Sequence, residues 1–141
     1  MEQEDTIDYN IRKTWQNITK MYSRTANQYM GSMALGMIIL NIDIKNGTPS
    51  TRLGPSMGME ANSLSRSLNK LELIGIIERR TDPDDLRKSI IKLTPLGVKR
   101  REIAKKCVID FNESIKSHFK EEEINIFFTV LNKINKIIEA N

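Results

Sequence analysis

Residues 48–97 hold the pattern that decides the fold, and they read TPSTRLGPSMGMEANSLSRSLNKLELIGIIERRTDPDDLRKSIIKLTPLG. Leu64, Leu68 and Leu71 recur at spacings of four and three, which places them on one face of a helix. The opposite face carries amide, hydroxyl and cationic side chains and has no acid before Glu72. Groups of this kind hydrogen-bond to base edges and phosphates in a major groove. The stretch therefore predicts an amphipathic helix with one apolar face and one face suited to DNA.

A β-hairpin is expected after this helix. Two isoleucine pairs, at residues 76–77 and 90–91, lie on either side of the turn-forming residues 81–85, which read TDPDD. Strands are therefore predicted over residues 76–80 and 89–93.

A shorter helix is expected before the amphipathic one. Thr48 and Pro49 are typical of an N-cap followed by a proline at the first helical position, which predicts a helix over residues 49–57. A further proline inside this stretch should kink or shorten that helix. The amphipathic helix itself is predicted over residues 61–74, with Gly75 as its C-cap. A helix–turn–helix followed by a hairpin is a winged helix, so the predicted fold class is mainly α with a small β-hairpin wing.

Two helices are expected on the N-terminal side of the winged helix-turn-helix. Residues 1–6 are polar and should be frayed, and an amphipathic helix should run from Ile7 to near Met30. Residues 33–44 are apolar almost all round, which predicts a helix buried on several sides and capped by Ser32.

Two more helices are expected on the C-terminal side. Thr94 should cap a long helix, and a break near Lys120 should separate it from the last helix. The stripes of apolar residues on the first helix and on these two comprise Ile7, Ile11, Trp15, Ile18, Tyr22 and Tyr29, then Ala104, Cys107, Val108, Phe111, Ile115 and Phe119, then Ile124, Phe127, Phe128, Leu131, Ile134, Ile137 and Ile138. These stripes need a partner, which is either another helix of the same chain or a second copy.

Length and charge fit one domain with a local nucleic-acid face. A chain of 141 residues is long enough for a sizeable core in a single domain, residues 1–141. The formal net charge is +4, and residues 48–106 hold 13 lysines and arginines against 7 acids, whereas both ends of the chain carry acidic clusters. A basic middle between acidic ends suits DNA binding by one face. A surface that is simply solvated is the alternative explanation for this charge distribution.

The remaining composition favours a cytoplasmic protein with no membrane partner. The single cysteine excludes an intrachain disulfide, and the acidic, polar N-terminus does not resemble a signal peptide. The most apolar stretch, residues 33–44, is too short to cross a bilayer.

A specific resemblance rests on the order S-R-x-L-x-x-L-E-x-x-G-I-I-E-R, followed by D-x-x-D-x-R-x-S-x-x-x-L-T-x-x-G. This pattern resembles the MarR family of bacterial transcription regulators, and its wing half is the more specific. The residues that carry it are Ser65, Arg66, Leu68, Leu71, Glu72, Gly75, Ile76, Ile77, Glu78 and Arg79, then Asp82, Asp85, Arg87, Ser89, Leu93, Thr94 and Gly97.

The resemblance implies an architecture and a set of partners. Residues 33–97 would form a winged helix-turn-helix lobe that binds DNA, flanked by N- and C-terminal dimerisation helices at residues 7–31 and 98–141. Such a chain forms an intertwined homodimer and binds double-stranded DNA at a pseudopalindromic operator, as a repressor that a small ligand releases. A winged helix that binds another protein is the alternative function, because fold alone does not decide it.

The expected DNA contacts lie on the amphipathic helix and on the wing. Arg66 suits a phosphate or a guanine, and neighbouring polar residues suit base edges. The resemblance implies that Arg87 enters the minor groove and that Asp85 holds its loop. The full predicted set is Thr51, Asn62, Ser63, Ser65, Arg66, Asn69, Lys70, Arg79, Arg80, Asp85, Arg87 and Lys88. Arg100 and Arg101 are either further contacts or solvated helix residues.

A ligand pocket is expected where the first helix meets the second. The candidate lining is Trp15, Tyr22, Tyr29, Met33 and Met37, because methionine and aromatic side chains form adaptable apolar pockets. Ordinary core packing is the alternative. The resemblance implies a small aromatic or lipophilic inducer, and the absence of an obvious internal cation favours a neutral or long apolar one.

Enzymatic and metal chemistry are not expected. The sequence has no G-x-S-x-G, no glycine-rich phosphate loop and a single histidine, His118, so no catalytic residue, no metal site and no cofactor is predicted. Cys107 lies on an apolar stripe, which favours inert packing over redox sensing.

Overall fold

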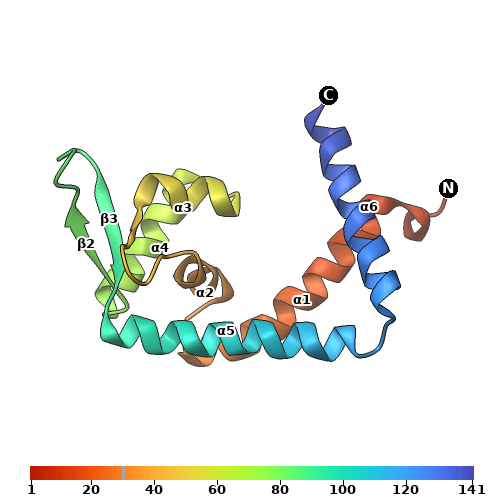
Figure 1. Ribbon diagram of the computed structural model, residues 1–141, viewed down its shortest axis with the longest axis horizontal. Helices are drawn as coiled ribbons and strands as arrows, with labels where there is room; N and C mark the ends of the chain where they lie inside the picture. The colour runs from red at the N-terminus through yellow and green to blue at the C-terminus, as the bar shows by residue number, and fades with distance from the viewer. Residues whose placement is uncertain (30) are drawn as a thin grey trace. The chain divides into compact units, whose positions relative to one another are not determined.

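The computed structural model describes residues 1–29 and 31–141, which fall into two compact units, Met1–Lys105 and Lys106–Asn141. Figure 1 labels most of the helices and strands, which follow the order η1 (Gln3–Asp5), α1 (Ile7–Tyr29), α2 (Met33–Leu40), β1 (Thr48–Pro49), α3 (Ser50–Met57), α4 (Ala61–Leu73), β2 (Ile77–Thr81), β3 (Ser89–Leu93), α5 (Pro95–Lys116) and α6 (Glu121–Glu139). The predicted fold class, mainly α with a small β wing, is confirmed.

The N-terminal helix begins where the sequence predicted, but the residues before it are not frayed. Gln3–Asp5 form a 3-10 turn, and the Asn10 side chain donates hydrogen bonds to the carbonyl oxygens of Glu4 and Thr6, at 2.8 and 2.7 Å. This local side-chain bonding fastens the turn to the first turn of α1. The predicted end of α1 at Met30 lies outside the described residues.

The second helix is shorter than predicted. Ser32 caps α2 as expected, since its hydroxyl accepts a hydrogen bond from the Leu35 N–H at 3.2 Å. The helix ends at Leu40 rather than near residue 44, because the Asp43 carboxylate accepts the backbone N–H groups of Lys45 and Asn46 at 2.9 and 2.8 Å. An aspartate that bonds the backbone just after itself favours a turn over a further helical turn. These two hydrogen bonds, that of Asn46 first, lower the pKa of Asp43.

The wing has three strands, whereas the sequence predicted a hairpin. The antiparallel order is β1-β3-β2, and the register pairs Thr48 with Ile91 and Ile77 with Leu93. Thr48 was predicted to be the N-cap of the next helix, but it lies in β1, and Pro49 is the cap residue of α3. A proline is tolerated in β1 because this strand is at the sheet edge.

The core of the N-terminal unit lies between α2, α3, α4 and the sheet. Its fully buried side chains are Ile38, Ile39, Ile42, Leu53, Leu71, Ile76 and Ile91. The leucine face predicted for α4 is confirmed, because Leu64, Leu68 and Leu71 are all buried. This burial fixes which face of α4 remains exposed.

The joint between the wing and α5 depends on Thr94. Its hydroxyl accepts a hydrogen bond from the Gly97 N–H at 3.0 Å, which confirms the predicted N-cap. The same hydroxyl donates a hydrogen bond to the carbonyl oxygen of Gly75 at 2.5 Å. The Thr94 N–H also donates to the Ile76 carbonyl oxygen at 3.0 Å. The start of α5 is therefore bonded to the turn between α4 and β2.

The C-terminal unit contains the last part of α5 and all of α6. Lys120 precedes α6, and its N–H donates to the Glu123 carboxylate at 3.0 Å, so the predicted break near Lys120 is confirmed. None of the residues of α6 is buried within the chain. Across the described residues, no helix is both long and apolar enough to cross a membrane.

Candidate nucleic-acid interface

The exposed face of α4 carries most of the side chains predicted to contact bases. Burial of the three leucines leaves the opposite side free, and Ser63 alone among the predicted α4 residues is half-buried. The exposed members are Asn62, Ser65, Arg66, Asn69 and Lys70. An Arg66 guanidinium nitrogen lies 3.4 Å from the Ser63 hydroxyl, so Arg66 lies along the helix surface. A helix of this kind presents donors and acceptors at a spacing that fits a major groove.

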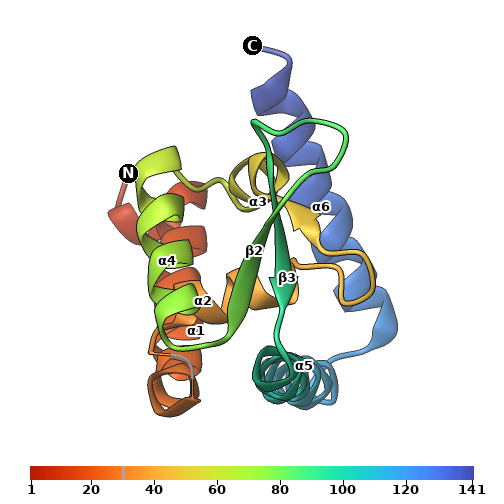
Figure 2. The same cartoon turned by 90° about the vertical axis from the view of Figure 1, so that its left-hand side faces the viewer.

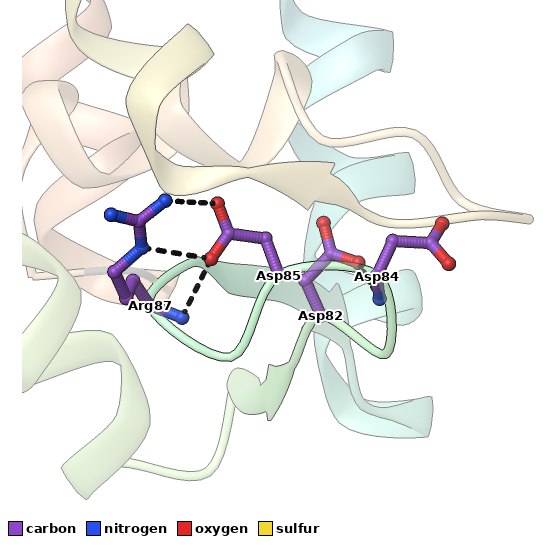
Figure 3. A network of polar contacts seen from close by, with 4 residues as sticks. All are labelled: Asp82, Asp84, Asp85 and Arg87. Atoms are coloured by element: carbon purple, nitrogen blue, oxygen red, sulfur yellow. Dashed lines mark hydrogen bonds and ion pairs between the residues drawn. The ribbon is translucent and has the colours of Figure 1, made fainter.

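The wing loop is ordered by its own aspartates. Figure 3 shows the Asp85 carboxylate accepting three hydrogen bonds from Arg87, from the backbone N–H at 3.1 Å, from Nε at 3.2 Å and from Nη2 at 3.4 Å. Across the loop, Asp82 N–H donates to the Lys88 carbonyl oxygen at 3.0 Å, and the Asp82 carboxylate accepts from the Asp84 N–H at 2.9 Å. These hydrogen bonds within the loop fix its conformation.

The Arg87 guanidinium remains available despite this pairing. Its side chain is 91% exposed, whereas that of Asp85 is 27% exposed. The hydrogen bonds from the Arg87 side chain, and then from its backbone, lower the pKa of Asp85. Asp85 thus remains ionised and in place at neutral pH, and the cation that it orients faces solvent.

The two arginines of β2 differ in environment. Arg80 pairs with Glu78 at 2.7 Å and its side chain is 61% exposed. Arg79 is turned toward α4, where Nη2 donates to the Asn69 amide oxygen and Nε lies 3.7 Å from a Glu72 carboxylate oxygen. The structure therefore brings Arg79 and Asn69 together, which sequence spacing did not indicate.

The other predicted contacts lie around these elements. Thr51 is exposed in the first turn of α3, and Lys88 is exposed after the wing loop. The Lys70 ammonium lies near Gly31, 3.6 Å from where a Cβ at that glycine would be. The Lys70 side chain therefore extends from α4 to the joint between α1 and α2.

Arg100 and Arg101 are not solvated helix residues. Arg100 is half-buried with its guanidinium 5.6 Å from the Tyr29 ring centroid, and the Arg101 side chain is only 20% exposed. An arginine at this distance over an aromatic ring is attracted by the ring face. The sequence analysis expected no obvious internal cation in the candidate pocket, whereas Arg100 lies over Tyr29, one of the predicted lining residues. Spacing along the chain did not indicate this contact, because the two residues are far apart in sequence.

The predicted ligand-lining residues lie on two helices that pack together. Trp15 and Tyr29 of α1 are 48% and 41% exposed, and Tyr22 is half-buried. Met33 and Met37 of α2 are half-buried, and Met33 packs against the core. The group therefore combines ordinary core packing at Met33 with exposed aromatic surface on α1.

The comparisons with known proteins match this geometry. The MarR family profile matches residues 32–89, which run from the cap of α2 into β3. The HTH-type transcriptional regulator BilQ of Clostridium symbiosum (strain WAL-14163) is 32% identical over 110 residues, covering 78% of this chain and 76% of that protein. The chain belongs to the MarR family. As a MarR protein it is a DNA-binding transcriptional regulator and not an enzyme.

Solved MarR-type structures share the fold over nearly the whole chain. The S. aureus MepR–DNA complex superposes with a TM-score of 0.86 at 20% identity, covering 93% of this chain and 97% of that one. Streptococcus pneumoniae FabT in complex with DNA gives 0.80 at 20% identity, covering 95% and 96%. At this identity the likeness confirms the winged-helix fold that the sequence predicted.

Proposed function

We propose that this MarR protein acts in the cytoplasm as a homodimer that binds double-stranded DNA at a pseudopalindromic operator. The observation that carries the proposal is the exposed amide and cationic face of α4 beside an ordered wing with a 91% exposed Arg87. The helix would enter a major groove, and Arg87 the adjacent minor groove, where a narrow groove attracts arginine. MepR and FabT, which share the fold, have been crystallised with DNA.

The residues divide by the part of DNA that their chemistry suits. On α4, Asn62, Ser63, Ser65 and Arg66 would face bases, and Lys70 a phosphate. Thr51, Arg80 and Lys88 would contact the backbone, whereas Asp85 positions Arg87. Asn69 and Arg79 form a separate pair, joined by a hydrogen bond.

The first test of this function is fluorescence anisotropy on DNA flanking the protein's own gene, beside unrelated DNA, at two salt concentrations. Tight binding to the flanking DNA that weakens with salt supports a specific regulator, because phosphate contacts release counterions. Weak binding to both DNAs even at low salt would favour the alternative, a winged helix that binds a protein partner.

Replacing Arg66 with alanine should weaken binding to the operator by about 1–3 kcal/mol. If Arg66 reads a base, the loss on unrelated DNA should be smaller, and if it contacts a phosphate, the loss should be equal on both. Arg12→Ala on the exposed side of α1 removes the same charge away from the interface and is the matched control. An unchanged affinity for Arg66→Ala in the same anisotropy assay would remove Arg66 from the interface.

Replacing Asp85 with asparagine tests the ordered wing against simple electrostatics. The change removes a negative charge, so Coulomb attraction alone predicts tighter DNA binding. The structure predicts weaker binding instead, because the acid that orients the Arg87 side chain is lost. Asp84→Asn, in the same loop, removes an equal charge without touching Arg87 and should not weaken binding. Equal affinity gains for both variants in a titration would contradict the positioning role.

The pH dependence of the Asp85–Arg87 contact follows from the lowered pKa. A carboxyl group whose pKa is lower in the folded than in the unfolded protein stabilises the folded state at pH values above its unfolded pKa. This stabilisation is lost as the pH falls through the folded pKa. The wing contact should therefore be complete at neutral pH and persist below the ordinary pKa of an aspartate, 3.8.

Dimerisation is proposed from apolar side chains that the chain leaves exposed. In the N-terminal unit Ile7, Ile11 and Trp15 are 64%, 44% and 48% exposed, and in α6 Phe127 and Ile138 are 54% and 64% exposed. Apolar stripes of this size on long helices indicate a partner surface. A twofold dimer would place two α4 helices in successive major grooves about 34 Å apart. Sedimentation equilibrium showing a monomer at micromolar concentration would contradict the dimer.

Repression relieved by a small ligand is the finer part of the proposal. A ligand held near Trp15, Tyr22, Tyr29, Met33 and Met37 would favour a dimer geometry in which the α4 helices are wrongly spaced, and it can do so only through its differential affinity for the two states. Arg100 against Tyr29 adds a cation, so aromatic and acyl acids belong in the screen beside neutral compounds. Calorimetry with no binding, together with unchanged DNA affinity, would exclude this site.

A further inference from the structure

We propose that Arg79 fixes the side-chain amide of Asn69 so that Asn69 reads guanine rather than adenine in the operator. The inference rests on the proposed entry of α4 into the major groove. It assigns two roles: Asn69 is a specificity-determining residue, and Arg79 is a positioning residue that acts through it.

The geometry places Arg79 between two residues of α4. Figure 2 shows β2 beside α4. Arg79 lies on β2, and its side chain reaches the helix at Asn69. Its Nη2 donates to the Asn69 amide oxygen, and its Nε lies 3.7 Å from Glu72, which is one helical turn beyond Asn69. The Arg79 side chain is 30% exposed, so most of its surface is covered by protein rather than presented to DNA.

The chemistry of arginine decides which end of the amide faces which way. A guanidinium has donors only, so the Asn69 atom that contacts it must be the oxygen. The usual ambiguity between the two ends of an asparagine amide is therefore resolved by the partner. Asn69 is exposed on the same side of α4 as Asn62 and Arg66. With its oxygen bonded to Arg79, its NH2 group is the part of the amide left to contact a base.

An amide whose oxygen is bonded to Arg79, with one of its two lone pairs occupied, favours one purine over the other. Guanine presents two acceptors, N7 and O6, in the major groove, and both can accept from the Asn69 NH2 group. Adenine presents the N7 acceptor beside an N6 amino donor, and asparagine reads it by accepting with its oxygen and donating with its nitrogen. Because Arg79 holds the Asn69 oxygen, this pairing with adenine is disfavoured.

The matched arginine on the same strand provides the control. Arg80 pairs with Glu78 and does not bond to α4, so Arg80→Met removes the same charge as Arg79→Met while leaving the Asn69 amide held. Arg79→Met frees the amide to rotate, which allows the two-bond contact with adenine.

The experiment is selection of bound sites from operator DNA randomised in one half-site, followed by affinity measurements on guanine- and adenine-substituted operators. Wild type should prefer guanine at one position, and Asn69→Ala should lose about tenfold in affinity for that operator and little for unrelated DNA. Arg79→Met should shift the preference at that position toward adenine. Arg80→Met removes a proposed backbone contact, so it should weaken binding to all operators alike without moving the preference. A uniform loss for Arg79→Met, with no change in preference, is what a purely structural role predicts.

Three results would overturn the inference. In the first, the Asn69→Ala protein binds the operator as tightly as wild type, and in the second it loses the same affinity for all DNA sequences. In the third, Arg79→Met leaves the base preference unchanged. The wild-type measurement distinguishes failure of this inference from failure of the proposed function. If wild type does not distinguish the operator from unrelated DNA, the proposed function itself fails, whereas specific wild-type binding with an unaltered preference in Arg79→Met removes the inference alone.

Discussion

Replacing Gly97 with alanine should destabilise the N-terminal unit by about 2–3 kcal/mol, although alanine favours helix over glycine by about 1 kcal/mol. A Cβ on Gly97 would overlap the carbonyl oxygen of Ile76 and would lie 3.2 Å from the carbonyl carbon. Ile76 is 2% exposed and its carbonyl oxygen already accepts from Thr94, so this backbone has nowhere to move. The overlap therefore outweighs the gain in helix propensity.

Urea unfolding followed by circular dichroism would measure this change. Lys99→Ala, at an exposed position of the same helix, is the control and should stay within about 0.5 kcal/mol of wild type. A Gly97→Ala protein as stable as wild type would mean that α5 can move away from the wing at this point.

Two leucines of α4 should differ strongly in how much stability is lost when each is replaced with alanine. Leu71→Ala should cost about 2–5 kcal/mol, because its side chain is 0% exposed and its removal leaves a cavity in the core. Leu73→Ala should change stability by at most about 0.5 kcal/mol, because Leu73 is 85% exposed. Both substitutions keep the helix propensity high, so the difference between them measures packing.

The same pair separates stability from DNA binding. Leu71→Ala should raise the unfolded fraction and lower the active concentration, while the affinity of the folded molecules changes less. Unfolding midpoints, together with titration of the DNA-binding fraction with operator DNA, would distinguish these effects. Equal stability of the two variants would contradict the position of Leu71 in the core.

Local patterns in the sequence predicted much of the winged helix-turn-helix. The leucine spacing fixed the buried face of α4, β3 was predicted with its observed ends, and Thr94 was correctly identified as a cap. Each of these depends on residues within one or two turns of chain. The periodicity that short-range spacing produces is therefore enough to find them.

The features that the sequence did not reveal depend on tertiary contacts or on one side chain overriding a propensity. β1 exists only because Thr48 meets Ile91 in the folded chain, and a strand of two residues has no periodicity to detect. The early end of α2 depends on the Asp43 turn, which competes with an otherwise strongly apolar helix. The Arg79–Asn69 contact likewise joins a strand to a helix, so no spacing within either element predicts it.

The bonds made by Thr94 determine how a movement of α5 would be transmitted. Because the Thr94 hydroxyl and N–H bind carbonyl oxygens of Gly75 and Ile76, the first turn of α5 is attached at the point where α4 ends and β2 begins. A change in the direction of the first turn of α5 would therefore act on the end of α4 and the start of β2 together. A signal that reaches α5 would therefore act in a single step on α4 and on the wing, the two elements that we propose contact DNA, without a separate route to each.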